Sequence, residues 1–410
     1  MDEDLLSQGD DREPSPWPRR LGVIAAVVAV AVGGIVYLTQ SGHGRTAASA
    51  AHPTPATSSA APASNPPSAA PPLMIELAPV GPNGIIGQTV PWEDGLRLPV
   101  TGRQPAWYSP ASGRSEAIGG LPADGSGYQF TRVGGGWAVQ ADAPAKTACG
   151  DCAGPARPVW FLADGAQSAT PVGTADLVAP AVGARALWLT SYPSAADPGT
   201  SAGVAREVSG TGAMLAAPVT LPPGSVIDQA TDRGLLLTSA NEQPGTALYR
   251  LWDPASPTPG RTFDNVIAAS ATEIAWTSRC APTTCRVQVL DLATGRPGAI
   301  ALPARSTAAN AAFSPSGAFI ALQLSYGLDG ALAMRLDVAS IADGRLTQVP
   351  GTSVSSDALF GFGWPTSGDS LVAEFNFMPI MQLASWHPGA SRLAVTVIQP
   401  GPTEASLIVG

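Results

Sequence analysis

Short apolar runs separated by clusters of Gly, Pro, Asp and Ser fill the chain from about residue 73 onward. The runs are rich in Val, Leu, Thr and Trp, and no window keeps a helical apolar period over three turns. This pattern predicts many short β-strands joined by turns. Residues 311–325 are predicted to form two strands joined by a tight Pro-Ser-Gly turn. The alanine-rich stretch 301–313 reads as a loop that leads into a strand.

The second of those two strands is one copy of a repeat. Equivalent positions, 51, 48, 39, 46 and 51 residues apart, are Trp137, Trp188, Leu236, Ala275, Ala321 and Val372. A later turn repeats independently at Ser109, Leu162, Ser209, Asp253, Asp291, Asp337 and His387. Both rhythms fall in or near the period of propeller blades. The sequence therefore predicts an all-β, seven-bladed β-propeller over residues 73–410, with about four strands in each blade; six or eight blades stay open alternatives.

The first 72 residues have a different pattern. Residues 21–38 carry no charge, and a run of about 18 such residues can cross a bilayer. Arg12, Arg19 and Arg20 precede the run and Arg45 follows it, a bias that places the N-terminus in the cytoplasm. We expect a cytoplasmic tail (1–20), a transmembrane signal-anchor (21–39) in the cell membrane, a disordered Pro/Ala-rich linker (40–72) and an extracytoplasmic propeller. Cleavage after the small residues 48–50, as in a signal peptide, is the alternative.

One turn carries a family resemblance. The stretch FSPSGAFIAL, which starts at Phe313, is similar to the Phe-Ser-Pro-Asp-Gly turn of TolB-like and other WD-repeat-like bacterial propellers, with Ser316 at the usual Asp position. The other six units match this turn poorly. The resemblance implies the propeller fold, and it implies binding of a protein or peptide more often than catalysis.

Four cysteines form two local pairs, Cys149 with Cys152 and Cys280 with Cys285. Local disulfides are the expected state outside the membrane. Both spacings also occur in zinc sites. The pairs belong to units two and five, however, so four thiolates could not converge on one ion. A redox role for the first pair is disfavoured because the pair lies between strands and not at a helix N-terminus.

The connections between the second and third strands of the units are predicted to share one face, and loops on a rigid scaffold are where binding residues usually lie. They are residues 142–157, 192–204, 241–246, 280–285, 326–331 and 376–381. The last is unusually apolar, so it either folds back over the blade edge or forms an exposed contact patch. The candidate partner-binding residues are Tyr192, Tyr326, Phe377, Met378 and Met381.

No catalytic, cofactor-binding or metal site is predicted. The G-x-S-x-G match at 199–203 lacks the strand and helix that a hydrolase elbow needs, and His387 is expected on the face opposite Ser201. A net charge of −9 argues against nucleic acid. The strand tryptophans Trp137, Trp188, Trp276 and Trp364 are expected to pack between blades. We therefore expect a non-enzymatic propeller that binds a protein, a peptide or a cell-envelope component. A propeller hydrolase or lyase with carboxylates at the channel mouth is the alternative.

Overall fold

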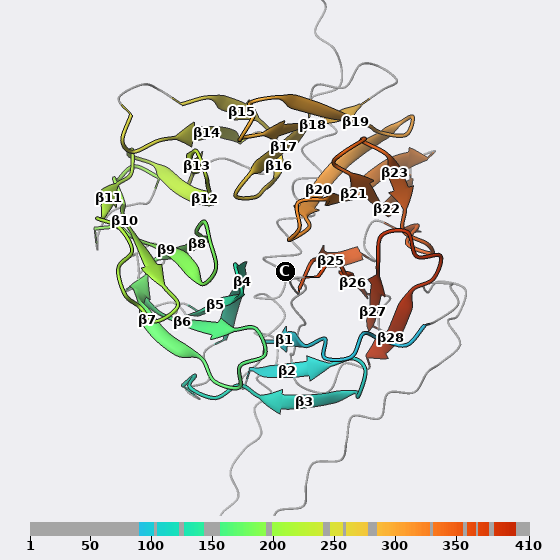
Figure 1. Ribbon diagram of the computed structural model, residues 1–410, viewed down its shortest axis with the longest axis horizontal. Coiled ribbons are helices and arrows are strands. Elements are labelled where there is room, and N and C mark those ends of the chain that lie inside the picture. The colour runs from blue at the N-terminus through green and yellow to red at the C-terminus, as the bar shows by residue number, and fades with distance from the viewer. Residues whose placement is uncertain are drawn as a thin grey trace, which may run out of the picture. The chain divides into compact units, whose positions relative to one another are not determined.

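The computed structural model describes residues 90–101, 105–122, 127–142, 156–193, 199–240, 247–256, 260–277, 285–328, 331–355, 359–365, 368–376 and 381–398. Within these ranges every regular element is a β-strand, and the strands form seven antiparallel sheets (Figure 1). We number the sheets as blades 1 to 7 in chain order. In each blade with four strands along its main path we letter the strands a to d from the centre outward.

Blades 1 to 4 use the first fifteen strands. Blade 1 has β1 (Leu98–Val100), β2 (Ala106–Ser109) and β3 (Arg114–Ala117). Blade 2 has β4 (Tyr128–Val133), β5 (Gly136–Ala141), β6 (Arg157–Ala163) and β7 (Thr170–Ala175). Blade 3 has β8 (Leu177–Pro180), β9 (Ala186–Ser191), β10 (Val204–Ser209) and β11 (Val219–Thr220). Blade 4 has β12 (Ser225–Thr231), β13 (Gly234–Ser239), β14 (Leu248–Trp252) and β15 (Thr262–Asp264).

Blades 5 to 7 repeat this order. Blade 5 has β16 (Val266–Ala269), β17 (Glu273–Thr277), β18 (Arg286–Asp291) and β19 (Pro297–Ala301). Blade 6 has β20 (Ser306–Phe313), β21 (Phe319–Leu328), β22 (Ala331–Ser340) and β23 (Leu346–Gln348), and β24 (Val354–Ser355) also pairs with β22. Blade 7 has β25 (Leu359–Gly363), β26 (Leu371–Asn376), β27 (Met381–Trp386) and β28 (Ala394–Ile398).

The hydrophobic core is divided among the faces between neighbouring blades. Each of seven buried clusters joins one blade to the next, and the seventh joins blade 7 back to blade 1. An open stack of seven sheets would have six such interfaces, so the seventh closes the ring. In the closing cluster Val372 and Leu383 of blade 7 pack with Trp92, Leu98 and Tyr108. The seven-bladed propeller predicted from the repeats is confirmed.

The repeat landmarks fall on equivalent strands. Trp137, Trp188, Leu236, Ala275, Ala321 and Val372 all lie on b strands, as the spacing predicted. The four tryptophans are packed as expected, although Trp364 directly follows β25 and is not on a strand. Trp137, Trp188 and Trp364 are buried, and Trp276 is partly buried against the cluster between blades 4 and 5. The Trp364 indole N–H also donates to the carbonyl of Ala312 in the neighbouring blade at 3.0 Å.

The Pro-Ser-Gly turn between β20 and β21 forms as predicted. The Gly317 amide donates to the Ser314 carbonyl at 2.9 Å, and Gly317 has a φ of 69°, which favours glycine. The Ser316 hydroxyl accepts the Ala318 amide at 3.1 Å and donates to the Asp369 carboxylate in blade 7 at 2.8 Å. Serine therefore serves both the turn and the contact between the two blades at the position where the resembling turns have aspartate.

Two expectations about blade 6 were wrong. Ser306–Phe313 is all strand and not a loop leading into one, because each of its ends pairs with β21. Tyr326 is not in a loop either, since β21 continues to Leu328 and β22 begins at Ala331. The antiparallel register of β21 and β22 runs through Gly327, inside the predicted loop of residues 326–331.

Several sequence predictions lie outside the described residues. These are the tail, signal-anchor and linker of residues 1–72, the cysteines Cys149, Cys152 and Cys280, and the loop residues Phe377 and Met378. In the described ranges, no helix has the length and apolar character needed to span a membrane.

Candidate functional site

The b–c connections of blades 2 to 7 leave the strands at one end, which we call the b–c face. The antiparallel order of each blade places the d–a links at the same end and the tight a–b turns at the other end. Figure 1 shows the a strands β4, β8, β12, β16, β20 and β25 nearest the centre. The b–c face is therefore built from starts of a and c strands and ends of b and d strands.

Three exposed apolar side chains lie at the b–c face of blades 3 and 4. Leu177 starts β8, Val204 starts β10 and Leu248 starts β14, and these side chains are 37%, 43% and 44% exposed. Among the described residues only two other large hydrophobic residues are this exposed, Met214 and Leu215, and both lie in the c–d connection of blade 3. We call Leu177, Val204 and Leu248 together the apolar strip. By strand alternation Leu177 and Leu248 lie on the sides of blades 3 and 4 that face each other, and Val204 lies on the side of blade 3 that faces blade 2.

The strip rests on a rigid support. The Tyr192 amide donates to the Asp176 carboxylate at 2.7 Å, and the Tyr192 hydroxyl donates to the Ser225 carbonyl of blade 4 at 2.9 Å. An Arg157 Nη2–H donates to the Asp176 carbonyl at 2.7 Å, which ties blade 2 to the same link. Burial lowers the pKa of Arg157 and raises that of Tyr192 to about 12. The Tyr192 side chain is thus buried and its hydroxyl hydrogen bonds within the protein.

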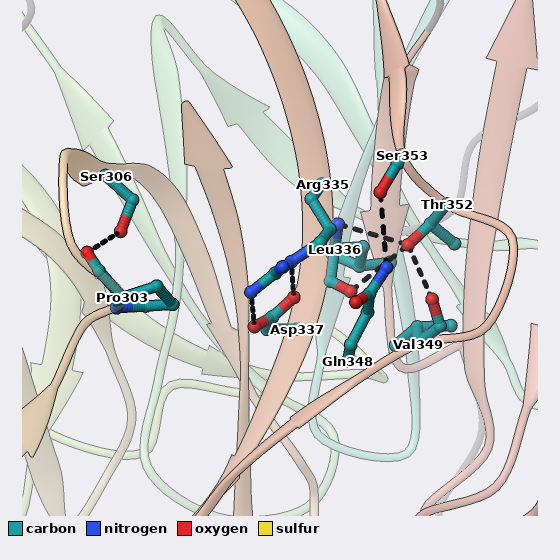
Figure 2. A network of polar contacts seen from close by, with 9 residues as sticks. All are labelled: Pro303, Ser306, Arg335, Leu336, Asp337, Gln348, Val349, Thr352 and Ser353. Carbon is teal, nitrogen blue, oxygen red and sulfur yellow. Dashed lines mark hydrogen bonds and ion pairs between the residues drawn. The ribbon is translucent and has the colours of Figure 1, made fainter. Parts of the chain in front are cut away.

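A buried ion pair lies on β22 (Figure 2). Its residues share a side of β22 with Ala339, which packs in the cluster between blades 5 and 6. The Arg335 Nε–H donates to Asp337 Oδ1 at 2.5 Å and the Nη2–H donates to Oδ2 at 2.6 Å. The Asp337 side chain is 2% exposed and the Arg335 side chain 21% exposed. The guanidinium carbon lies 4.9 Å from the centre of the Tyr326 ring. Residues two apart on a strand share a face, which is why Arg335 and Asp337 meet.

Burial dominates the electrostatics of this pair. It raises the pKa of Asp337, although the Arg335 guanidinium pulls that pKa down. Desolvation also raises the pKa of Tyr326, with Arg335 acting in the opposite direction. Both directions show that the charges of the pair are partly shielded from water, where an ionic contact is stronger than at a surface.

Neighbouring polar contacts hold β22 in place. The Thr352 hydroxyl donates to the Val349 carbonyl at 2.8 Å and accepts the Leu336 amide at 3.2 Å (Figure 2). Thr352 is fully buried. The backbone that carries Arg335 and Asp337 is therefore fixed on its outer side as well as by the β21 ladder.

The central channel offers one carboxylate on the described inner strands, Asp228. Asp228 occupies a β-bulge between Ile227 and Gln229, and similar register shifts occur in β16, β20 and β25. Asp228 is exposed to solvent, yet the protein atoms around its carboxyl group desolvate it and raise its pKa. The inner strands that the structure describes do not bring two carboxylates together.

A polar cluster at the opposite face includes the histidine singled out in the sequence. The fully buried Ser370 hydroxyl donates to Glu93 Oε2 at 2.6 Å and lies 2.8 Å from His387 Nε2. The Glu93 contact links the segment before blade 1 to blade 7. Ser201 lies in the b–c connection of blade 3, at the other end of the blades from His387, as predicted. These positions do not form a Ser-His-carboxylate relay with an accessible serine.

The structure describes only some of the residues that were predicted to bind a partner. Met381 starts β27 and packs against the cluster that closes the ring. Cys285 precedes β18 and packs against the cluster between blades 5 and 6. The partner role of Tyr192, Tyr326 and Met381 and the cysteine pairing stay predictions.

Sequence reasoning missed the apolar strip and the Arg335–Asp337 pair. The pair had a signal, since RLDV puts two opposite charges on one face of an otherwise apolar strand. Leu177, Val204 and Leu248 had none, because burial of a strand's first residue depends on how the neighbouring blades overlap.

No protein-family model matches the chain, and no curated protein matches it in sequence. Solved structures are similar in fold. Prolyl oligopeptidase B from Galerina marginata has a TM-score of 0.48 and 11% identity over 72% of this chain and 48% of that one. A putative 6-phosphogluconolactonase from Bacteroides uniformis has 0.39 and 17% identity over 65% and 84%. TolB from Acinetobacter baumannii has 0.35 and 13% identity over 63% and 65%.

These matches correct one expectation. The sequence led us to expect a protein that is not an enzyme, but matched structures of this fold include peptidases as well as TolB. The chain spans about half the length of the prolyl oligopeptidases it matches. The propeller fold is thus shared by proteins of both kinds, and the non-enzymatic assignment is withdrawn; the chain's fold class, a seven-bladed β-propeller, is what is established.

Proposed function

We propose that the protein binds a peptide or an extended protein segment on the b–c face. The observation that carries this proposal is the apolar strip of Leu177, Val204 and Leu248, which places three exposed hydrophobic side chains at one end of two neighbouring blades. Apolar anchors on a rigid base are typical of the centre of a protein interface. Met381, one of the predicted contact residues, starts β27 at the same face, on blade 7.

The support beneath the strip favours a preformed surface. Tyr192, Asp176 and Arg157 hydrogen bond across three consecutive blades at this end. A surface fixed in this way loses little conformational freedom when a ligand binds. Its geometry suits an extended chain that crosses from blade to blade, with side chains meeting the strip.

A peptide selection tests this function. Peptides selected from a random phage-displayed library on the full-length protein are expected to bind a variant with Val204→Ser and Leu248→Ser at least 10-fold more weakly, because each lost anchor costs about 1–2 kcal/mol. Affinity is measured by fluorescence anisotropy. Both side chains are already exposed, so the melting temperature should change little.

The matched control carries Met214→Ser and Leu215→Ser, which removes two somewhat more exposed hydrophobic side chains from the other end of blade 3. This variant should bind the selected peptides as the unmodified protein does. Loss of binding in the control with retention in the Val204 and Leu248 variant would place the binding surface elsewhere, and a selection that yields no peptide would argue against the proposal.

A further inference from the structure

Only some of the N–H donors of the Arg335 guanidinium make hydrogen bonds to described residues of the protein. An arginine side chain has five N–H donors in a planar fork. The Asp337 carboxylate accepts hydrogen bonds from the Nε–H and from one Nη2–H, along the side edge of the guanidinium. The end edge, with both hydrogens of Nη1 and the second hydrogen of Nη2, has no hydrogen bond to another described residue. The side chain as a whole is 21% exposed, so part of it faces solvent.

The plane of the guanidinium is fixed before any ligand arrives. Asp337 holds one edge with two hydrogen bonds, and the Tyr326 ring lies on one face at 4.9 Å. A fork held in this way loses little freedom when it accepts a second pair of hydrogen bonds. Two parallel N–H groups match the two oxygens of a carboxylate, which they bind side by side.

A second arginine lies at the same end of blade 6. Arg305 is exposed and directly precedes Ser306, which pairs with Tyr326 in the β20–β21 ladder. Arg305 has a φ of 60° in the turn that the Ser306 amide closes by donating to the Pro303 carbonyl at 3.2 Å. That conformation favours glycine, so an arginine here is held at some cost in strain. Because Asp337 neutralises Arg335, the charge of Arg305 leaves these three residues with a net charge of +1 on a protein whose net charge is −9.

We propose that the end edge of Arg335, together with the charge of Arg305, binds a carboxylate of an acidic peptide at the b–c face. This inference rests on the proposed function and names the chemistry of its ligand. The carboxylate comes from a Glu or Asp side chain or from a C-terminus, and it adds a polar contact on blade 6 to the apolar contacts on blades 3 and 4.

Three fluorescein-labelled probes test the proposal on the full-length protein: amidated hexaglutamate, amidated hexaglutamine, and hexaglutamine with a free C-terminus. Hexaglutamate is expected to bind at least 10-fold more tightly than amidated hexaglutamine. If a C-terminus suffices, the free-acid hexaglutamine recovers most of that difference. Arg335→Lys, which keeps the charge and loses the fork, should weaken hexaglutamate binding about 10-fold.

Arg305→Gly is a variant that the backbone conformation at this position favours. Glycine relieves the positive φ, so the melting temperature should stay the same or rise while hexaglutamate binds several-fold more weakly. Arg392→Gly, which removes another exposed arginine at the opposite face, is the matched control and should have no effect. The inference is overturned if hexaglutamate and amidated hexaglutamine bind equally, or if Arg305→Gly and Arg335→Lys leave affinity unchanged. Equal binding that still depends on Leu248 would overturn the carboxylate site and leave the proposed function standing.

Discussion

Replacing Arg335 by Leu is expected to lower the free energy of unfolding by about 3–5 kcal/mol, the usual cost of removing one partner from a buried ion pair. The reason is that Asp337, 2% exposed and bound by two hydrogen bonds to Arg335, would keep a buried carboxylate with no counter-charge. Urea denaturation followed by tryptophan fluorescence measures the change. Arg335→Lys should cost less, because an ammonium still faces the carboxylate.

The double variant with Arg335→Leu and Asp337→Leu separates the charge from the packing. Apolar side chains of the cluster between blades 5 and 6 surround this face of β21 and β22, so two leucines should restore most of the lost stability. Arg97→Leu is the control, since its ion pair with Glu116 is exposed and should contribute no more than about 1 kcal/mol. A double variant as unstable as Arg335→Leu would contradict this account.

Replacing Glu374 by Gln is expected to stabilise the protein at pH 8 and to leave its stability at pH 4 nearly unchanged. Glu374 lies on β26, 2% exposed, and shares its face with Val372 and Leu383 at the interface that closes the ring. Burial raises its pKa from 4.5 to about 7. The folded protein therefore holds this proton more tightly than the unfolded chain does.

The wild type should lose stability as the pH rises. The tightly held proton of Glu374 contributes to the free energy of unfolding. That contribution is fully present below pH 4.5 and is lost as the pH rises to about 7, where the buried carboxyl must ionise. At about 1.4 kcal/mol for each unit of pKa difference, the loss reaches about 3 kcal/mol by pH 8. Melting temperatures of the wild type and Glu374→Gln between pH 4 and 8 should diverge as the pH rises.

The melting temperature of the Glu374→Gln variant should still fall with rising pH, but by less than that of the wild type. Burial and the nearby Asp291 raise the pKa of Glu273 to about 6, so its contribution is lost between pH 4.5 and 6. Glu116→Gln, at an exposed carboxylate, is the control and should follow the wild type. Curves for Glu374→Gln and wild type that run parallel from pH 4 to 8 would show that Glu374 is not buried as described.

The sequence predicted the architecture because the repeat consists of regularly spaced positions that must be apolar in every blade. Ala275, Val372 and Trp137 are three different residue types, yet each occupies the buried part of a b strand. The spacing of such positions survives substitution, since any apolar side chain of suitable size can fill the face between two blades. The number of blades followed from the later landmark, which recurs seven times.

The candidate site could not be predicted in the same way. The apolar strip depends on which strand ends stay uncovered when blades overlap, and the Arg335 site depends on Tyr326 reaching the guanidinium from a neighbouring strand. Tyr326 was singled out from the sequence, but its location was assigned to a loop. Its surroundings became clear only when the β21–β22 register was known.

Closure of the ring by Trp92 and its neighbours has a consequence for how the domain comes apart. Every buried cluster is shared by two blades, so no blade contains a core of its own and none can open without exposing apolar surface on both sides. The amide hydrogens of the b strands are thus protected from exchange by the cooperative packing of all seven blades. Amide hydrogens in all of them should exchange through one common opening event, with the outer d strands exchanging earlier by local fraying.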